Sequence, residues 1–209
     1  MQKKIISFVL FDLDGVLINS KLNMKFSWNK VKRKFRLNQN FDEYFDFIGL
    51  PFEKILKKIK ITKNLVKIEK EYKKNSILSF DKIKLYKNVK NTLELLKNNN
   101  IKIGIVTSKD KTRTIKIIKK LKIDIFNIVV CPQKKLRGKP FPDQINHAVK
   151  KLNVKKKETI YVGDMLVDYL SAKNANIDFV FASYGYGKDY SFYKKKLVYI
   201  SDLKKNIIL

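Results

Sequence analysis

The chain of 209 residues contains 47 Lys+Arg against 19 Asp+Glu, which gives a formal net charge of +28. Its length allows one domain with a large insert or two small domains, and 44% hydrophobic residues exclude wholesale disorder in spite of the charge. The single cysteine, Cys131, excludes an intramolecular disulfide, and no apolar run approaches the roughly 20 residues of a membrane-spanning helix. We therefore expect a cytoplasmic protein without a membrane partner.

Five largely apolar segments predict the strands of the fold, in chain order 4–11, 101–106, 125–130, 159–162 and 178–182. Such near-continuous apolar runs are typical of strands that are buried on both faces of a parallel sheet. Amphipathic helical patterns lie between them, as at Val89, Leu93 and Leu96. This alternation predicts an α/β fold with a doubly wound parallel sheet. A short strand over 197–200 and a terminal turn over 201–209 are expected to end the chain.

Residues 17–86 interrupt this alternation, because they contain only helical periods. Met24 and Trp28 share one face of a predicted helix, and Gly49 and Pro51 mark a stop and a restart before the next one. The segment therefore predicts an all-helical insert. The expected organisation is a core made of two segments and a helical insert between them: 1–16 and 87–209 for the core, and 17–86 for the insert.

The positive charge is almost entirely lysine, since only four basic residues are arginine: Arg33, Arg36, Arg113 and Arg137. The charge is spread along the chain, whereas a nucleic-acid surface is usually concentrated and rich in arginine and aromatic residues. Solvated lysine faces are therefore favoured over a specific nucleic-acid site, although anionic small molecules would be attracted. Arg33 and Arg36 in the insert could clamp a second anionic group of a substrate, but a solvated face is again favoured.

Two carboxylates, Asp12 and Asp14, directly follow the first predicted strand. Residues two apart in an extended segment point the same way, so these side chains can converge at the carboxyl end of the strand, where open α/β sheets bind ligands. Adjacent carboxylates repel each other unless they share a proton or a cation, and oxygen ligands of this kind suit Mg²⁺. Taken alone, the pair could also be two solvated aspartates in a loop.

Thr107 and Ser108 follow the second predicted core strand and precede a helix. Their hydroxyls and the free backbone N–H groups of a helix start suit a phosphate, although an ordinary helix N-cap is the more common use of such residues. Lys139 stands out among the many lysines because Gly138 and Pro140 flank it in a predicted turn, where a lysine can serve a phosphate as a point charge.

Asp164 and Asp168 follow the strand predicted over 159–162, and Gly163 permits close backbone approach there. A spacing of four places the two carboxylates one helical turn apart if a helix begins at this point. The alternative interpretation is a helix-capping acid together with a surface acid.

In chain order these segments read DLDGVL, IVTSK, GKPFPD and YVGDMLVDYLSAKNA, and they resemble the four motifs of the haloacid dehalogenase-like superfamily. The insert between the first two motifs is similar to the C1-type cap of the phosphoglycolate phosphatase-like branch. The resemblance implies a Rossmann-like α/β core with an inserted all-helical cap that acts as a mobile lid. Asn88 and Asn176 stand where relatives often have glycine, and asparagine tolerates the same positive φ.

The resemblance also implies catalytic roles. Asp12 would attack phosphorus to give an aspartyl-phosphate, and Asp14 would act first as general acid and then as general base. Members of the superfamily that dehalogenate lack an acid two residues after the nucleophile, so Asp14 favours phosphatase or phosphomutase chemistry. A Mg²⁺ ion would be held by the Asp12 carboxylate, the Asp14 backbone carbonyl, Asp164 and, in support, Asp168.

Three further residues would bind the phosphoryl group by resemblance: Thr107, Lys139 and a backbone N–H near Ser108. The implied activity is that of a Mg²⁺-dependent phosphatase, phosphoglycolate phosphatase-like, which hydrolyses a small phosphorylated metabolite. A sugar phosphomutase or a nucleotide pyrophosphatase on the same scaffold remains an alternative. A basic nucleic-acid-binding protein without turnover is the less favoured alternative from another class.

Overall fold

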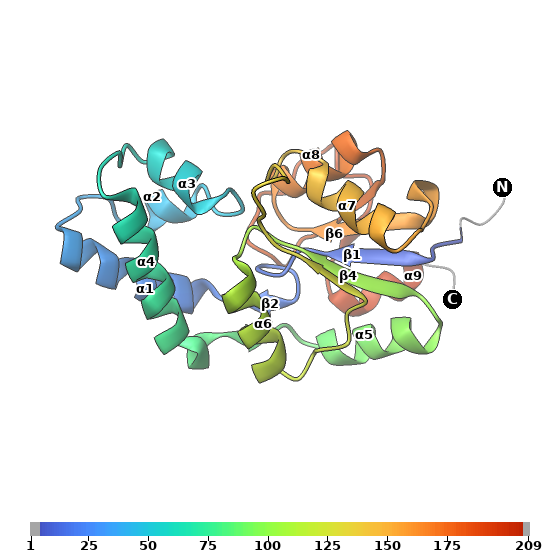
Figure 1. The fold of residues 1–209 in the computed structure, drawn as a ribbon. Coiled ribbons are helices and arrows are strands. Elements are labelled where there is room, and N and C mark those ends of the chain that lie inside the picture. The colour runs from blue at the N-terminus through green and yellow to red at the C-terminus, as the bar shows by residue number, and fades with distance from the viewer. Residues whose placement is uncertain (1–4, 207–209) are drawn as a thin grey trace.

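The computed structural model describes residues 5–206 and contains a central six-stranded parallel sheet (Figure 1). Its strand order is β5-β4-β1-β6-β7-β8, so the chain winds outward in both directions from β1 and the doubly wound sheet is confirmed. In chain order the strands are β1 Phe8–Phe11, β4 Lys102–Val106, β5 Ile128–Val130, β6 Thr159–Gly163, β7 Asp178–Ala182 and β8 Lys196–Leu197.

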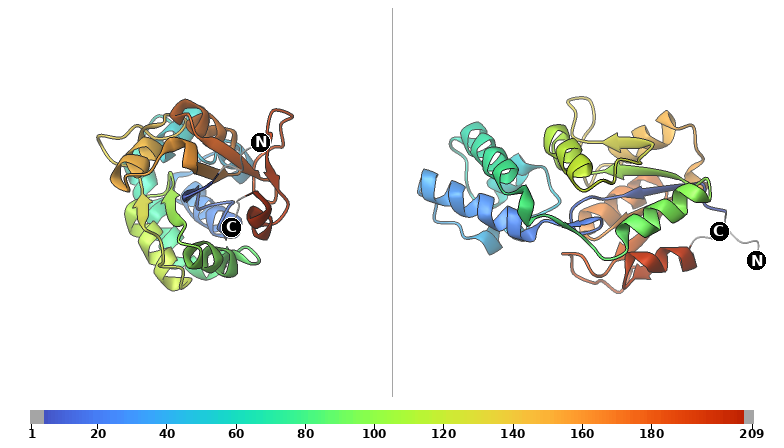
Figure 2. Two further views of the ribbon diagram at one scale, coloured as in Figure 1. Left: turned by 90° about the vertical axis from the view of Figure 1, so that its right-hand side faces the viewer. Right: turned by 90° about the horizontal axis from the view of Figure 1, so that it is seen from below.

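Helices cover both faces of this sheet (Figures 1 and 2). Because alternate side chains of a strand point to opposite faces, Val9 and Phe11 of β1 join one hydrophobic cluster while Phe8 and Leu10 join another. The first cluster contains α5 and α6, and the second contains α7 and α8. The helices of the sheet core are α5 Val89–Asn98, α6 Lys111–Lys120, α7 Asp143–Lys151, α8 Leu166–Ala175 and α9 Leu203–Asn206, with 3₁₀ turns at Lys156–Glu158 and Ile200–Asp202.

Asn88 and Asn176 lie at helix ends in the left-handed region, which agrees with the expectation that asparagine tolerates a positive φ at these positions. Asn88, with φ 66°, precedes α5, and Asn176, with φ 58°, follows α8. Asparagine adopts this conformation more readily than most other non-glycine residues, so both helix ends form without a glycine.

Three predicted strands are clearly shorter at one end than expected. The strand expected over 4–11 is β1, and within the described residues it begins only at Phe8. The strand expected over 125–130 begins only at Ile128, because Asn127 uses its side-chain oxygen to accept the N–H of Ile103 in place of a regular ladder bond. The strand expected over 197–200 ends at Leu197, since a turn in which Asp202 accepts the backbone N–H of Tyr199 follows it. The parts of the predicted terminal segments at 1–4 and 207–209 lie outside the described residues.

The four helices between β2 and β3 form a unit that we call the helical module, residues 21–78. Its helices are α1 Lys21–Phe35, α2 Phe41–Phe45, α3 Phe52–Lys58 and α4 Leu65–Leu78, followed by a 3₁₀ turn at Phe80–Lys82. They enclose a hydrophobic cluster of their own, in which the fully buried Trp28 stacks on Tyr44 at a ring-centroid distance of 4.6 Å. Trp28 is therefore part of the hydrophobic interior of the module.

A two-stranded antiparallel ribbon joins the helical module to the sheet core. β2 (Ile18–Asn19) pairs with β3 (Lys84–Leu85), so the chain enters and leaves the module side by side (Figure 2). The expectation of purely helical structure over 17–86 was wrong at these two points, because a strand of two residues is too short to show a period of two.

Gly104 in β4 allows the sheet to pack closely against its neighbours. A Cβ at this position would lie 2.8 Å from Ile128 Cγ2 and 2.9 Å from Leu10 Cδ2. We expect Gly104→Ala to lower the free energy of unfolding by about 1–3 kcal/mol through overpacking. Urea unfolding at constant m-value measures this loss. As a control, Glu94→Ala replaces an exposed side chain, and its free energy of unfolding should stay within about 0.5 kcal/mol of that of the parent protein. If the parent protein and Gly104→Ala have equal free energies of unfolding, the side chains of Ile128 and Leu10 move aside without cost and the prediction is wrong.

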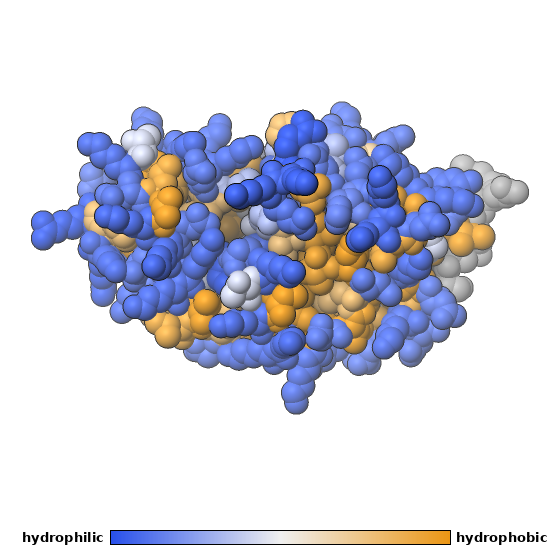
Figure 3. All heavy atoms as spheres, viewed as in Figure 1, coloured by the Kyte–Doolittle hydropathy of each residue, from blue (hydrophilic) through white to orange (hydrophobic). Residues whose placement is uncertain are grey.

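Hydrophilic side chains dominate the face of the molecule drawn in Figure 3. Among the helices within residues 5–206, none combines the length and the apolar character that crossing a membrane requires.

Candidate active site

The two carboxylates that follow β1 lie in different surroundings. Asp12 is buried, and its backbone N–H extends the ladder by donating to Val162 O at 2.9 Å. Asp14 is more exposed; its Oδ1 accepts the hydroxyl of Ser20, and its Oδ2 lies 3.2 Å from Lys109 Nζ. The two aspartates are thus held by separate partners, which allows them to have separate chemical roles.

Lys139 is the cation nearest to Asp12. Its Nζ lies 2.8 Å from Asp12 Oδ1 and 2.6 Å from Asp168 Oδ1, and its side chain is 1% exposed. Burial favours the neutral amine, but the charges of Asp12 and Asp168 outweigh it and raise the pKa of Lys139. Lys139, the lysine that its flanking glycine and proline singled out in the sequence, therefore lies in its charged form against the candidate nucleophile Asp12.

Asp164 and Asp168 lie where β6 passes into α8. Asp168 Oδ2 accepts the backbone N–H groups of Asp164 at 3.2 Å and Met165 at 3.0 Å, so Asp168 does cap the start of the helix. Its Oδ1 faces Lys139 and also lies 3.1 Å from the Tyr161 hydroxyl. The capping interpretation of the sequence thus holds for Asp168, but the interpretation of the other acid as a surface residue does not, since Asp164 is completely buried.

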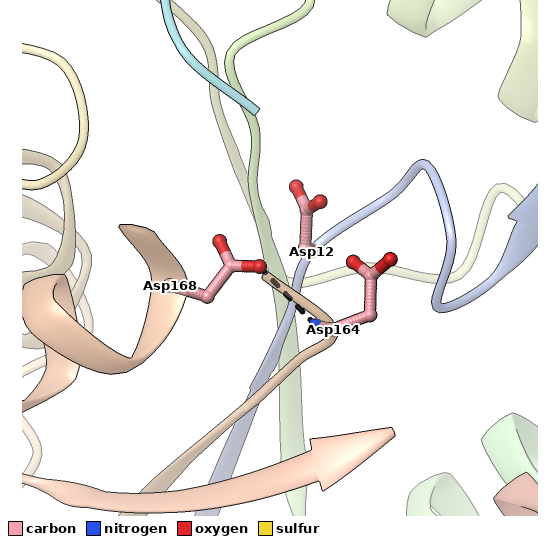
Figure 4. A group of neighbouring side chains, drawn as sticks. All are labelled: Asp12, Asp164 and Asp168. Carbon is pink, nitrogen blue, oxygen red and sulfur yellow. Dashed lines mark hydrogen bonds between the residues drawn. The ribbon is translucent and has the colours of Figure 1, made fainter. Parts of the chain in front are cut away.

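Three carboxylates converge at this edge of the sheet (Figure 4). Asp12, Asp164 and Asp168 each offer an oxygen, and these atoms all lie within 4.8 Å of one another. Burial raises the pKa of Asp12 to about 7, and burial together with the charges of Asp168 and Asp12 raises the pKa of Asp164 well above its ordinary value. A divalent cation bound by these oxygens would remove the repulsion, and carboxylate oxygens are the ligands that Mg²⁺ takes in proteins.

The surroundings of Asp164 support this fit. Its Oδ1 is buried without a hydrogen-bond partner, which is costly for a carboxylate unless a cation neutralises it. The other oxygen, Oδ2, accepts the backbone N–H of Tyr186 at 2.7 Å. Backbone crowds around the side chain, since a Cβ on Gly15, whose φ is +85°, would lie 2.1 Å from Asp164 Oδ2. These residues therefore hold Asp164 in a fixed position with one oxygen available for an ion.

Thr107 and Ser108 lie at the end of β4, as predicted, but neither caps the following helix. The N-cap of α6 is Asp110, whose Oδ1 accepts the backbone N–H of Arg113 at 3.0 Å. The N-cap interpretation of the two hydroxyl residues was wrong, because the chain runs on for two more residues before the helix begins. Ser108 Oγ donates to Gly49 O of the helical module at 2.7 Å, while Thr107 is buried beneath it.

A small cavity of about 60 Å³ lies between the carboxyl edge of the sheet and the helical module. From the sheet core it is lined by Asp12, Asp14, Thr107, Ser108, Lys109, Arg113, Lys139, Met165 and Tyr186. The helical module contributes Met24, Tyr44, Ile48, Gly49, Leu50, Phe52, Ile55 and Tyr72. The five sequence-predicted residues Asp12, Asp14, Thr107, Ser108 and Lys139 thus share one cavity, beside the buried Asp164 and Asp168.

Sequence reasoning missed three residues of this site: Lys109, Arg113 and Tyr186. Lys109 is buried and paired with Asp14, yet in the sequence it is one lysine among many. Arg113 has a weak signal in the sequence, because arginine is rare in this chain. The hydroxyl of Tyr186 accepts the backbone N–H of Ser20 at 2.7 Å, so this residue links Asp164 to the start of α1.

A family model for haloacid dehalogenase-like hydrolases matches residues 9–182, a span that includes every residue of this site except Tyr186. The chain belongs to the haloacid dehalogenase-like hydrolase family. Among curated relatives in this family, Pyrophosphatase PpaX from Halalkalibacterium halodurans is 30% identical over 189 residues, covering 88% of this chain and 87% of the relative. Pyrophosphatase PpaX from Bacillus mycoides is 31% identical over 181 residues, covering 86% and 84%.

Solved structures of the family share the fold. A protein from Lactobacillus plantarum assigned as a phosphoglycolate phosphatase superimposes with a TM-score of 0.89 at 20% identity, covering 96% of this chain and 99% of that one. A haloacid dehalogenase-like hydrolase from Bacteroides fragilis gives a TM-score of 0.87 at 24% identity, covering 95% and 99%. At these identities the likeness establishes the architecture, and the chemistry must be argued from the residues of the site.

Proposed function

We propose that this chain is a Mg²⁺-dependent phosphatase that hydrolyses a small phosphorylated metabolite through an aspartyl-phosphate. The observation that carries the proposal is the position of Asp12, which lies against Lys139 within a group of three buried carboxylates. A carboxylate held beside one fixed cation and a candidate metal site is suited to attack a phosphate dianion, because the positive charges offset the repulsion between the two anions.

In the proposed reaction the Asp12 carboxylate forms a bond to phosphorus while the bond to the leaving oxygen breaks. Asp14 gives its proton to that oxygen, and then takes a proton from the water that hydrolyses the aspartyl-phosphate and restores Asp12. Thr107, a backbone N–H near Ser108, and Lys139 hold the phosphoryl oxygens.

The Mg²⁺ ion, when bound, would supply charge neutralisation and orientation of the phosphate. Its proposed ligands are the carboxylates of Asp12 and Asp164 and the backbone carbonyl of Asp14. Asp168 supports the site from beneath, through its contacts with Lys139 and with the backbone of Asp164.

We further propose that residues 17–86 act as a cap over a core formed by 1–16 and 87–209. Two features support this division: the separate hydrophobic cluster of the helical module, and the ribbon that is its connection to the sheet core. The cavity between the two parts would then exclude water and contact the leaving group.

The two curated relatives described above support pyrophosphate as a second candidate substrate, since both are named as pyrophosphatases. Hydrolysis of pyrophosphate uses the same attack on phosphorus, with phosphate in place of an alcohol as the leaving group. A panel of an aryl phosphate, phosphoglycolate and pyrophosphate, compared by kcat/KM, would rank the two candidates.

The metal site gives the test of the proposed function. We expect Mg²⁺-dependent release of phosphate from the aryl ester. Asp164→Asn should lose at least about 100-fold in this activity, because it removes a negative charge and puts an NH2 group where Oδ1 faces the ion, while the remaining oxygen accepts the Tyr186 N–H. Added Mg²⁺ should raise the thermal unfolding temperature of the parent protein and of the exposed control Asp124→Asn, but not that of Asp164→Asn. Undiminished activity in EDTA would rule the proposal out.

A further inference from the structure

Arg113 is a buried arginine in the wall of the cavity. It lies in the first turn of α6 and is 7% exposed. Its Nε lies 2.5 Å from Asp110 Oδ2, and its guanidinium carbon lies 5.5 Å from the ring centre of Tyr72 in the helical module. A side chain from the sheet core thus reaches the part of the cavity that the module encloses.

The three cations that line the cavity differ in where their acidic partners lie. Of its three cations, Lys139 is paired with Asp12 and Lys109 is paired with Asp14, and both of these acids line the cavity themselves. The partner of Arg113 is Asp110, which does not line the cavity. Arg113 is therefore the lining cation whose acidic partner lies outside the cavity wall.

The guanidinium group is also oriented by this pairing. Asp110 contacts Nε and the backbone N–H of Arg113, so it fixes the side chain from the helix side. The two terminal nitrogens of an arginine form the planar fork that binds a carboxylate or a phosphate through two hydrogen bonds. With its Nε edge held by Asp110, Arg113 is preorganised to receive an anion.

The rest of the wall offers little to neutralise that charge. All lining residues of the module are uncharged, and Tyr72, over whose ring the guanidinium lies, offers it only a neutral hydroxyl. A cation in such surroundings is stabilised by an anionic ligand far more than a solvated lysine would be.

We propose that Arg113 binds a second anionic group on the leaving group of the substrate, so that the enzyme selects small phosphate compounds with a carboxylate or a second phosphate. This inference rests on the proposed phosphatase function. It assigns substrate selection to α6 of the sheet core and not to the arginines of the insert, since Arg33 and Arg36 do not line the cavity.

The test compares substrates with and without the second charge. Phosphoglycolate and 2-hydroxyethyl phosphate differ in a carboxylate against a neutral alcohol, and pyrophosphate carries a second phosphate. For Arg113→Gln we expect the kcat/KM ratio of phosphoglycolate to hydroxyethyl phosphate to fall about 10- to 100-fold, with an intermediate fall for Arg113→Lys. The matched control Arg33→Gln replaces an exposed arginine outside the cavity and should leave the ratio unchanged.

The same variants distinguish the two anions. The kcat/KM of each doubly charged substrate is compared with that of hydroxyethyl phosphate. If Arg113→Gln lowers this ratio more for phosphoglycolate than for pyrophosphate, the second group is a carboxylate; if it lowers the ratio more for pyrophosphate, the second group is a phosphate. An unchanged ratio for both substrates in Arg113→Gln would overturn the inference while leaving the phosphatase function intact, because hydroxyethyl phosphate would still report turnover.

Loss of folding is controlled separately. Removing the guanidinium leaves Asp110 without its partner, so the double variant Asp110→Asn/Arg113→Gln is prepared as well; asparagine can still cap α6. If this variant melts at the temperature of the parent and shows the same fall in the ratio, the effect belongs to substrate binding. A fall that disappears in the double variant would instead show that the unpaired Asp110 caused it, and would overturn the inference.

Discussion

Asp12→Asn should abolish turnover while the protein stays folded. An amide cannot attack phosphorus, and loss of a nucleophile of this kind removes most of the rate enhancement of an enzyme, so we expect a fall of at least about a thousand-fold. The substitution keeps the shape of the side chain and removes one negative charge from a buried group of carboxylates. The strand ladder, in which the backbone N–H of Asp12 takes part, is unaffected.

Initial rates with an aryl phosphate and Mg²⁺ measure this effect, and circular dichroism melting checks the fold. Asp124→Asn, an exposed acid away from the site, serves as the matched control and should retain full activity. Substantial Mg²⁺-dependent hydrolysis by Asp12→Asn would contradict the assigned nucleophile.

Asp14→Asn should separate the two chemical steps. Protonation of the leaving group matters most for poor leaving groups, so the variant should lose about a hundred- to ten-thousand-fold with an alkyl phosphate. An activated aryl phosphate barely needs a proton, and the first step should survive with it. Breakdown of the aspartyl-phosphate still needs a base, so the variant should release one burst of aryl alcohol and then stall.

Pre-steady-state release of aryl alcohol from Asp12→Asn and Asp14→Asn, measured side by side, decides the matter. We expect a burst from the second variant alone. If both lose the burst equally, Asp14 is a structural residue whose contacts with Ser20 and Lys109 hold the cavity together.

Much of the fold follows from the sequence because the strands are buried on both faces. The apolar run that ends at Phe11 and the run that ends at Val106 both became neighbouring parallel strands. The short ribbon β2–β3 was not predictable, since its pairing of Ile18 with Leu85 is a contact between distant residues that no local period reveals.

The residues of the candidate site could be predicted where a polar side chain directly follows the end of a predicted strand. Asp12, Thr107 and Asp164 each come directly after a strand, and parallel strands bring their carboxyl ends to one edge of the sheet. Lys139 could be predicted only because a glycine and a proline flank it.

Lys109 could not be predicted, because only its burial distinguishes it from the other lysines, and the rarity of arginine gave Arg113 no more than a weak signal. Lysine is very common in this chain, and most of its lysines are solvated, so the sequence alone does not distinguish a paired, buried lysine from a solvated one. The position of Arg113 opposite Tyr72 depends on how α6 meets the helical module, which is a property of the assembled fold.

The central place of β1 has a consequence for synthesis on the ribosome. β1 is made first, yet its neighbours are β4 and β6, so Phe8 finds its pairing partners only when Lys102 and Thr159 have emerged. The helical module between them makes its contacts locally and can fold earlier, whereas sheet contacts between distant residues form slowly. Until then an apolar segment that is fully buried in the finished protein stays exposed on the nascent chain, and such segments are prone to aggregate. We therefore expect β1, Phe8–Phe11, to be the part of the growing chain that depends most on chaperones.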